Sequence, residues 1–521
     1  METDFDVIVI GAGINGAGIA RDAAMRGLKV LLIDKGDAGG GTSAASTRLI
    51  HGGLRYLEHY EFGLVHESLR ERETLLRIAP HLVRPLPITI PIYRESRRGR
   101  ATIRAGMIAY DLLSWGKSLP RHRMRSVAET LKEMPGLKAE GLVGSAVYYD
   151  AQVEFAERLV VENVLDAIEQ GARVLTYTRV TKLLTTEGRV AGVQLEGNFA
   201  DFAKADFVLN AAGPWVDELL GDGNKRLIGG TKGSHVVVAP FAGAPESAVY
   251  LEAVSDRRPF FIIPWNGNYL IGTTDVRFEN DPDEVRAESW EVDYLLAETN
   301  RAFPAAGLTR DRVLYTYSGV RPLPFTANED EQNITRRHFL REHPRFENVV
   351  SVVGGKLTTY RSLAEECVDL VLRKLGRKSL RSETASTPLP GARNYSQFGR
   401  EYLEAPKKIP VRWPRIYGSR AKEVAMLVER VNDALAAEIV FAFENEFAKT
   451  LADCFLRRSM IGLEADLGLG QIDAAANAGI KWLGWSEERA RREVEAYREE
   501  IFKMKKPNFS RLTHDRGHNG E

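Results

Sequence analysis

The stretch that decides the fold is Phe5-Asp-Val-Ile-Val-Ile-Gly-Ala-Gly-Ile-Asn-Gly-Ala-Gly18. Its β-branched run, 7–10, is typical of a strand buried on both faces of a parallel sheet. Gly11, Gly13 and Gly16 then form G-x-G-x-x-G, in which glycines permit a tight turn, close approach to a pyrophosphate and close helix packing. A helical pattern through Arg26, a second apolar strand at 30–33 and an acid, Asp34, complete the unit. Strand, turn, helix, strand and acid together predict a dinucleotide-binding fold rather than a chance glycine turn.

The segment after Asp34 distinguishes between dinucleotides. Lys35-Gly36-Asp37 leads into Ala38-Gly39-Gly40-Gly41-Thr42-Ser43 instead of another short β-α-β unit. Glycines and hydroxyls there can contact a cofactor that lies extended across the sheet. This favours FAD over a dissociable NAD.

Composition excludes several classes of protein. The 521 residues suffice for two or three domains, and Lys+Arg and Asp+Glu balance at 71 each, so no net field attracts nucleic acid. The two cysteines, Cys367 and Cys454, lack metal-ligand spacing, predict no metal site and suit a reducing compartment. The acidic N-terminus predicts no signal peptide, and the longest uncharged run, 259–274, is too short and broken to span a bilayer. A soluble or peripheral protein is expected.

Later segments return to the first sheet and build a second one. A helix is expected at 150–171 and a strand at 173–183 that enters a hairpin, while buried strands at 207–213 and 349–355 end at glycines and rejoin the dinucleotide sheet. Alternation at 232–275 and 315–322 predicts a largely antiparallel sheet that carries the substrate face. The expected organisation is FAD-binding segments at about 1–80, 145–230 and 345–383, substrate segments at about 81–144 and 231–344, a linker at 384–394, a helical domain at 395–510 and a disordered tail at 511–521.

Six motifs, in their order along the chain, resemble those of one family. They are the glycine fingerprint, Arg48-Leu-Ile-His-Gly-Gly-Leu-Arg-Tyr56, Lys232-Gly-Ser-His235, Pro259-Phe-Phe-Ile-Ile-Pro-Trp265 with Ile271-Gly-Thr-Thr-Asp275, Gly319-Val-Arg-Pro322 and Gly354-Gly-Lys-Leu-Thr-Thr-Tyr-Arg361. The family is that of the FAD-dependent glycerol-3-phosphate dehydrogenases, which are quinone-linked and membrane-associated. The resemblance implies an α/β protein: a Rossmann-like FAD-binding domain, an antiparallel-sheet substrate domain and an α-helical C-terminal domain.

The resemblance also implies the reaction and the cofactor contacts. Hydride would pass from sn-glycerol 3-phosphate to non-covalent FAD, giving dihydroxyacetone phosphate, and electrons would pass on to a membrane quinone. Val180 resembles a family residue whose backbone holds the adenine, but it could equally be a core valine. The expected FAD contacts are Gly11, Gly13, Asn15, Gly16, Asp34, Lys35, Thr42, Ser43, Arg48, Leu49, Val180, Ala212, Gly213, Gly355, Lys356, Leu357 and Thr358.

Substrate binding and catalysis require cations and a base. Guanidinium groups suit a phosphate dianion, and the resemblance points to Arg55, Arg336 and Lys356, with Arg337 as an alternative to Arg336. It also implies Tyr56 and Thr359 as substrate contacts. A neutral imidazole is the usual base near pH 7; the resemblance favours His235 over His51, although either could be a hydrogen-bonded core histidine. Arg321 and Lys356 would stabilise the developing alkoxide and the reduced flavin anion.

The stretch 94–125 suggests a membrane contact. It holds nine Lys and Arg, two acids and interleaved apolar residues, which suits an anchor on anionic lipid better than a merely solvated face. We therefore expect a cytoplasmic protein, peripheral on the inner face of the cell membrane, with glycerol 3-phosphate, a quinone and lipid as partners; a homodimer is compatible with this. One rival interpretation is the oxidase branch of the same family, whose usual insertion is not seen. A second is an RNA-binding flavoprotein of tRNA modification, whose expected cysteines and broad basic surface are missing. A third is a dinucleotide-binding subunit without chemistry.

Overall fold

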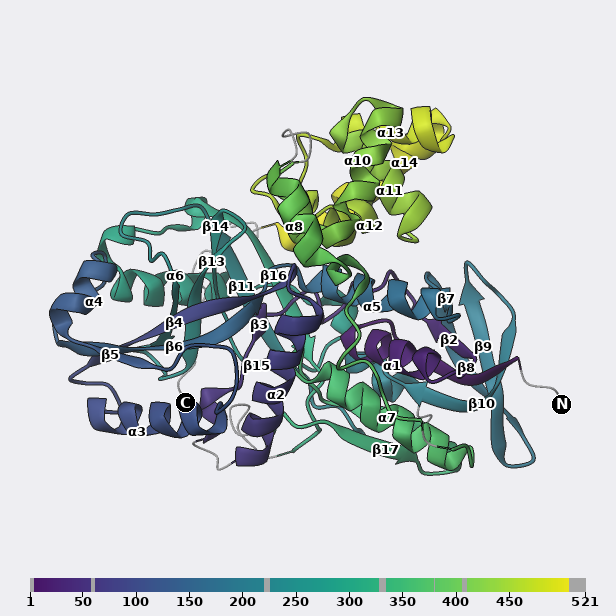
Figure 1. Cartoon of the computed structure of the whole chain (residues 1–521), viewed down its shortest axis with the longest axis horizontal. Helices are drawn as coiled ribbons and strands as arrows, with labels where there is room; N and C mark the ends of the chain where they lie inside the picture. The colour runs from purple at the N-terminus through teal and green to yellow at the C-terminus, as the bar shows by residue number, and fades with distance from the viewer. Residues whose placement is uncertain are drawn as a thin grey trace, which may run out of the picture.

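The computed structural model describes residues 4–57, 61–219, 225–327, 334–378, 380–404 and 410–505. Within these ranges the strands form two sheets that lie side by side, and a group of helices from the end of the chain lies against their junction (Figure 1). The tail predicted at 511–521 lies outside the described residues. The predicted fold class, an α/β body with a helical C-terminal part, is confirmed.

The first sheet is built around the strand that contains the quoted stretch. β1 (Phe5–Ile10) pairs in parallel with β10 (Phe202–Asn210) and β2 (Val30–Ile33), as predicted. β18 (Phe346–Val353) and β7 (Arg173–Leu175) extend the parallel part, and β17 (Phe339–His343) is an antiparallel edge. Helices α1 (Ile14–Met25), α5 (Ala156–Glu169) and α7 (Tyr360–Lys374) pack together beside this sheet.

The β-branched run of β1 is explained by what lies on its two faces. Val7 and Val9 share a core with α1, α5 and α7, whereas Ile8 and Ile10 share a core with β8 (Thr178–Thr186) and β9 (Arg189–Gly197). Both faces are covered, so neither face carries polar residues. The hairpin expected near residue 187 is confirmed, because β8 and β9 pair antiparallel around that turn.

Two predicted elements have the wrong bounds. The helix expected from residue 150 begins only with α5, because residues up to 153 belong to β6 (Leu142–Val153), which pairs with β4 (Val83–Tyr93) along its length. Pairing with a distant strand thus overrides the helical pattern. The strand expected at 173–183 is divided into β7 and β8, since Tyr177 between them has a left-handed φ of 55°.

The second sheet is largely antiparallel, as predicted. β11 (Thr231–Val238) pairs with β14 (Asn268–Gly272) and β16 (Val313–Arg321), and β13 (Pro259–Trp265) joins β14 to β12 (Ala248–Glu252). β12 also pairs in parallel with β4, which connects this group to β6. The remaining elements here are β3 (Leu49–Ile50), β5 (Arg123–Arg125), β15 (Val276–Arg277), α2 (Phe62–Ile78), α3 (Arg100–Leu113), α4 (Val127–Glu133) and α6 (Ser289–Ala302).

The chain ends in helices that contact both sides of the molecule: Arg457 pairs with Asp37 beside the first sheet, and Leu463 O accepts a hydrogen bond from Tyr315 OH of the second sheet. They are α8 (Tyr395–Glu404), α9 (Trp413–Ile416), α10 (Ala421–Val431), α11 (Ala434–Asn445), α12 (Leu451–Asp453), the π-helical turn η8 (Cys454–Arg458), α13 (Ile472–Leu483) and α14 (Glu487–Glu500). Ser486 caps α14, since its side chain accepts a hydrogen bond from Arg489 N. No helix within the described ranges combines the length and apolarity that crossing a membrane requires.

Candidate active site

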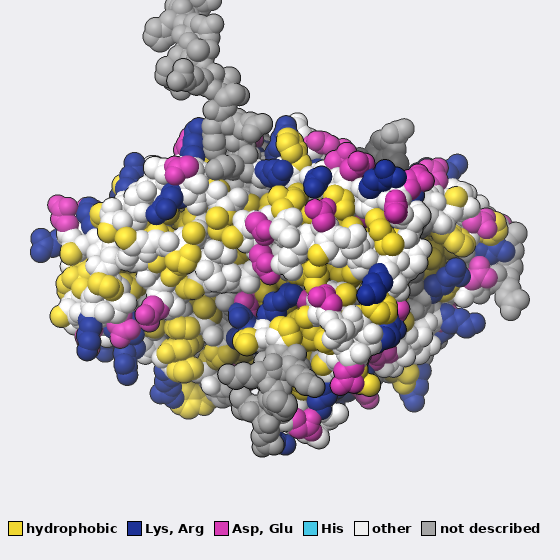
Figure 2. Space-filling view, turned by 90° about the horizontal axis from the view of Figure 1, so that it is seen from above, with side chains coloured by type: hydrophobic (Ala, Val, Ile, Leu, Met, Phe, Trp, Pro, Cys, Tyr) yellow, Lys and Arg dark blue, Asp and Glu magenta, His cyan; other side chains and the backbone are white. Residues whose placement is uncertain are grey.

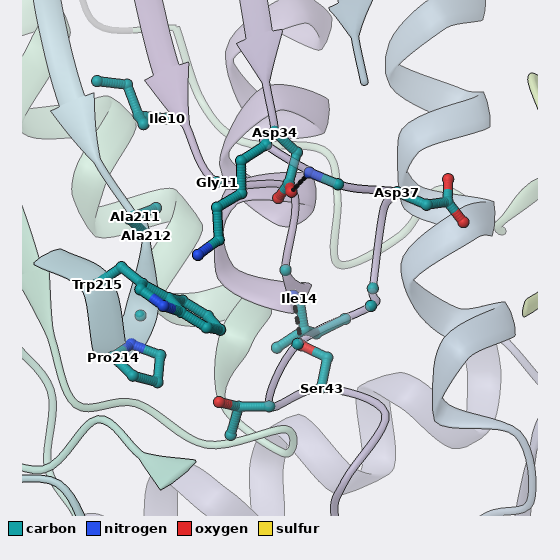
Figure 3. A pocket seen from close by; sticks show the side chains of 18 of the residues that line it. Ile10, Gly11, Ile14, Asp34, Asp37, Ser43, Ala211, Ala212, Pro214 and Trp215 are labelled. Atoms are coloured by element: carbon teal, nitrogen blue, oxygen red, sulfur yellow. Dashed lines mark hydrogen bonds between the residues drawn. The ribbon is translucent and has the colours of Figure 1, made fainter. Parts of the chain in front are cut away.

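A first cavity lies where β1, β2 and β10 end. Ligands of open parallel sheets bind at the carboxyl ends of the strands, and this cavity has a volume of about 520 Å³. Gly11, Gly13 and Gly213 line it, and Figure 3 shows Asp34 and Trp215 around its interior. The glycine fingerprint therefore faces open space rather than a packed interior.

Hydrogen bonds join the glycine turn to the loop after Asp34. Ala12 N donates to Asp34 Oδ2 at 2.6 Å, and Gly36 N donates to Oδ1 at 2.8 Å. Ile14 N, at the start of α1, donates to Ser43 Oγ at 2.9 Å. Burial raises the pKa of Asp34, although the two backbone donors oppose that shift. The carboxyl group is held at the cavity wall with acceptor capacity left for ribose hydroxyls.

A second cavity of about 350 Å³ adjoins the first. The two share lining residues from the loop after Asp34 and from the turn before α7, including Thr42, Gly355 and Lys356. Among the predicted catalytic and substrate residues, the second cavity collects His51, Tyr56, His235, Arg321, Arg336 and Lys356. Segments separated by about three hundred residues thus meet next to the first cavity.

Two arginines in the second cavity share one carboxylate. Arg321 NH1 and Arg336 NH2 each lie 3.0 Å from an oxygen of Asp275. Burial would raise the pKa of Asp275, but Arg321 and Arg336 hold it below its ordinary value. Arg321 is further engaged by Thr273 Oγ1 at 3.1 Å, whereas Arg336 NH1 is buried and has no hydrogen-bond partner among the residues that the structure describes. A buried guanidinium nitrogen with no partner is suited to an anionic ligand.

The two candidate bases are both uncharged near neutral pH. His235 lies on β11 with Nε2 at 2.9 Å from Thr47 Oγ1 and its ring stacked on Tyr317; Nδ1 is buried and meets no hydrogen-bond partner within the described part of the chain. Burial, with Arg321 and Arg48, lowers the pKa of His235 well below its ordinary value. Burial also lowers the pKa of His51 to about 4. Either imidazole is therefore in the form that accepts a proton.

Lys356 lies between the two cavities. Its Nζ is 3.8 Å from the centre of the Tyr56 ring and 3.5 Å from Ser68 Oγ. Burial lowers the pKa of Lys356 to about 7. A bound anion would favour the charged form of this amine.

Comparison with known proteins now identifies the family. Residues 6–369 match the FAD dependent oxidoreductase family, and residues 382–490 match the C-terminal domain of alpha-glycerophosphate oxidase. The glycerol-3-phosphate dehydrogenase of Synechocystis sp. is 46% identical over 95% of this chain and 96% of its own. The chain belongs to the family of FAD-dependent glycerol-3-phosphate dehydrogenases.

Other members of this family extend the comparison. The aerobic glycerol-3-phosphate dehydrogenase of Escherichia coli is 38% identical over 89% of this chain and 95% of its own. The D-erythritol 1-phosphate dehydrogenase of Brucella abortus is 36% identical over 87% of this chain and 94% of its own. The solved glycerol-3-phosphate dehydrogenase of Bacillus halodurans complexed with FAD covers 98% of this chain and 97% of its own, with a TM-score of 0.79 and 28% identity.

FAD is the cofactor of this family member, and the first cavity fits it. Gly213 has a left-handed φ of 61°, and a Cβ there would meet no atom within 4 Å, so the cavity reaches the backbone. Asn15 Oδ1 and Trp215 Nε1 are buried without partners. Lys35 Nζ lies 4.1 Å from the centre of the Trp215 ring and pairs with Asp283 at 2.6 Å. Free polar atoms and bare glycine backbone suit a phosphate-bearing ligand.

The structure divides the predicted FAD contacts into three groups. Gly16 lines neither cavity; a Cβ there would lie 1.8 Å from Gly11 O, so this glycine allows α1 to pack against the turn. Arg48, Leu49 and Thr358 line the second cavity instead of the first. The first cavity includes Gly11, Gly13, Asn15, Asp34, Lys35, Thr42, Ser43, Val180, Ala212, Gly213, Gly355, Lys356 and Leu357.

Three predicted residues are already paired, lie outside both cavities, or lie outside the description of the site. Arg48 forms a two-pronged ion pair with Glu157 at 2.7 Å, so its charge is already compensated. Thr359 is buried at the start of α7, lines neither cavity, and its carbonyl accepts a hydrogen bond from Ser362 Oγ at 3.0 Å. Arg55 lies in η1 (Leu54–Leu57), and its side chain is outside the described part of the chain.

Sequence reasoning missed a support behind His51. Asp150 Oδ1 accepts hydrogen bonds from Gly52 N at 3.1 Å, Tyr110 OH at 2.7 Å and Arg72 NH1 at 2.6 Å. These bonds fix the turn that presents His51. Asp275 was quoted only as the end of a motif, although an acid between two arginine-bearing motifs was a signal for the ion pair. Asp150 had no such signal, because its partners come from three separate elements.

Proposed function

We propose that this protein oxidises sn-glycerol 3-phosphate to dihydroxyacetone phosphate and passes the electrons to a membrane quinone. The observation that carries the substrate assignment is the Arg321–Asp275–Arg336 group in a cavity that adjoins the FAD cavity. Arg336 offers to the phosphate its NH1, which has no hydrogen-bond partner among the described residues, together with Lys356; the resemblance adds Arg55, whose side chain lies outside the described part of the chain. The ring of Tyr56 lies over the amino group of Lys356. The relatives named for glycerol 3-phosphate support the same substrate.

The residues around the reacting carbon have separate roles in this proposal. Bound FAD supplies the hydride acceptor. His235 takes the hydroxyl proton, because it is buried, neutral and keeps one ring nitrogen without a partner. His51 is the alternative base. Arg321, fixed by Asp275 and Thr273, places a positive charge next to the developing alkoxide.

The acceptor assignment rests on the surface around α3. Ile108 is 45% exposed, Leu112 62% and Trp115 71%, and the side chains of Arg97, Arg100 and Arg104 are also exposed. Exposed apolar and basic residues on one helix and just beyond its two ends suit the interface of an anionic membrane. We infer that the protein is peripheral on the inner face of the cell membrane and docks there through α3.

A third cavity lies between α3 and the active site. It has a volume of about 900 Å³, and its lining includes Ile103 and Met107 of α3. Leu54 and Tyr250 line both this third cavity and the second cavity, which we call the substrate cavity from here on. The lining also contains charged residues, among them Arg97, Arg98 and Glu252, so the cavity is only partly apolar. Its apolar part, between α3 and the substrate cavity, would give a lipid-soluble quinone a route toward the flavin. This supports the quinone over oxygen as acceptor.

The RNA-binding alternative has no support on the face shown in Figure 2. There, Lys and Arg side chains are interspersed with Asp and Glu rather than gathered into a basic patch. Binding to phosphate backbones requires clustered cations. We therefore retain the dehydrogenase proposal.

The substrate is tested by anaerobic flavin reduction. We expect the yellow protein to bleach with sn-glycerol 3-phosphate and to stay yellow with glycerol, which lacks the phosphate. D-erythritol 1-phosphate is the necessary comparison, since one relative is named for it. Faster reduction by that compound than by glycerol 3-phosphate would assign the chain to the other substrate.

The acceptor is tested with reduced protein and anionic vesicles that contain a quinone. We expect rapid reoxidation by the embedded quinone and slow reoxidation by oxygen; hydrogen peroxide formed at the rate of substrate oxidation would instead indicate an oxidase. Changing Arg97, Arg100 and Arg104 together to Glu should release the protein from the vesicles, since each cation at the surface is worth about 1 kcal/mol. The matched control makes the same change to Glu at the exposed Arg173, Lys182 and Arg189. These belong to β7, β8 and β9, which lie on the opposite side of the molecule from α3 (Figure 1).

A further inference from the structure

The C-terminal helices line part of the FAD cavity. Thr450, Arg457, Glu493 and Tyr497 belong to its wall together with the glycine fingerprint. Of these, Arg457 lies in the π-helical turn η8, and a Cβ placed on Gly40 would be 4.0 Å from its NH1. A domain that follows the oxidoreductase body in sequence thus reaches the loop that closes the cofactor site.

Two consecutive arginines of η8 converge on one carboxylate of that loop. Arg457 Nε lies 2.5 Å from Asp37 Oδ2, and Arg458 NH2 lies 2.9 Å from Asp37 Oδ1. Neighbouring residues on an ordinary α-helix point in different directions, and the wider π-turn, a form often found at functional sites, brings both side chains to Asp37. The Asp37 and Arg458 side chains are 1% and 0% exposed. This is a fully buried contact between distant parts of the chain.

Further hydrogen bonds and ion pairs connect this contact to both ends of the loop that carries Asp37. Arg457 NH2 also pairs with Asp453 at 2.8 Å, and Asp453 accepts a hydrogen bond from Tyr177 OH. Tyr177 N in turn donates to Gly36 O at 3.0 Å. Beyond Asp37, the same loop reaches Ser43, which accepts from the first turn of α1. Through Asp37, the C-terminal domain therefore holds the loop that runs from the ribose-binding acid, Asp34, to Ser43, which contacts the phosphate-binding turn.

We propose that the C-terminal domain retains the cofactor: Arg457 and Arg458 are positioning residues that fasten the 37–43 loop through Asp37 over the adenosine diphosphate half of FAD. Arg457 NH1 takes part in no hydrogen bond among the described residues and is available as a donor toward the phosphates. FAD release then requires this interface to open. The inference rests on FAD as cofactor and not on the substrate or the electron acceptor.

The test compares FAD binding in two variants and one control. Arg457→Met removes one partner of the contact, and Asp37→Asn keeps the shape of the side chain but removes the charge that both arginines share. Each loses a charge-assisted hydrogen bond near the ligand, so the Kd for FAD should rise by about 10- to 100-fold. Arg158→Met is the matched control: Arg158 and Glu446 form a buried ion pair at 2.6 Å between the same two parts of the chain, and neither lines the FAD cavity.

Thermal unfolding separates retention from general stability. Ligand binding stabilises a protein by an amount that depends on its Kd, so at a fixed FAD concentration the Tm increase caused by FAD should shrink in Arg457→Met and Asp37→Asn. In Arg158→Met the Tm of apoprotein and holoprotein should fall together, with the Kd for FAD within threefold of the parent. The proposal is overturned if Asp37→Asn binds FAD within threefold of the parent, or if both test variants lower the two Tm values equally. Neither readout uses the substrate, so failure here leaves the proposed reaction untouched.

Discussion

Replacing Arg336 by Met should identify the phosphate contact. Arg336 and Arg337 are neighbours in sequence, and sequence alone left both open. In the structure the Arg336 side chain is 17% exposed, lines the substrate cavity and keeps NH1 without a partner, whereas Arg337 is exposed and lines neither cavity. Arg337→Met is therefore a control of the same chemistry at the next position.

The magnitude follows from the bonds that are lost. A hydrogen bond to a charged group contributes about 1.5–3 kcal/mol. Asp275 keeps Arg321 at 3.0 Å when Arg336 is removed, so the carboxylate is not left alone. The Asp275 carboxylate does remain near the phosphate, however, and fewer positive charges then surround it. We therefore expect kcat/KM for glycerol 3-phosphate to fall about 10- to 150-fold, mostly through KM.

The assay is steady-state oxidation with a soluble dye acceptor, which avoids any effect on membrane binding. Arg337→Met should stay within threefold of the parent. The reduction of flavin by glycerol, slow as it is, should be equally slow in all three proteins, because glycerol has no phosphate. An equal loss in Arg336→Met and Arg337→Met, or an unchanged Arg336→Met, would refute the assignment of Arg336 as phosphate ligand.

Two further predictions concern protons. His235→Asn should lower kcat by about 10²- to 10⁴-fold with normal FAD content if this imidazole is the base; a loss below tenfold, with a larger one in His51→Asn, would transfer the role to His51. Lys356 has a pKa lowered to about 7, so it is charged below that pH and neutral above it. If its charge binds the phosphate dianion, kcat/KM should be highest between about pH 6, where the phosphate loses its second proton, and pH 7, and fall at higher pH. A pH–rate profile of Lys356→Met that keeps the same alkaline decline would exclude Lys356 as its source.

Local signals in the sequence were enough for the core of the fold. The glycine fingerprint and the run at 7–10 each specify a backbone geometry within a few residues, and β1, α1 and β2 follow them closely. The start of α5 was misplaced because residues 150–153 can form either a helix or a strand. Pairing with β4, which lies more than fifty residues earlier in the chain, stabilises the strand. Patterns within one segment do not contain that information.

Contacts between distant charged residues were beyond the same reasoning. His51 and His235 stood in quoted motifs and the family resemblance pointed to Arg336, and the structure brings all three to one cavity. Arg457 and Arg458 lie in an ordinary-looking helical segment, and Asp37 in a loop 420 residues away. No local pattern distinguishes these arginines from solvated ones. Their role becomes visible only when the C-terminal helices are placed against the FAD cavity.

In the proposed function, Asp275 gives the two arginines of the substrate cavity different roles. Arg321 donates to Asp275 from NH1 and to Thr273 Oγ1 and Thr274 O from NH2, so the guanidinium is held on two sides. A cation fixed in this way acts by its field, which is the preorganised form that stabilises charge in a transition state. Among the described residues, Arg336 is held by Asp275 through NH2 and its NH1 has no partner, which leaves NH1 for a ligand. On this proposal one carboxylate orients a cation for the reacting carbon and another for the phosphate, which accounts for an acid in a cavity proposed to bind a dianion.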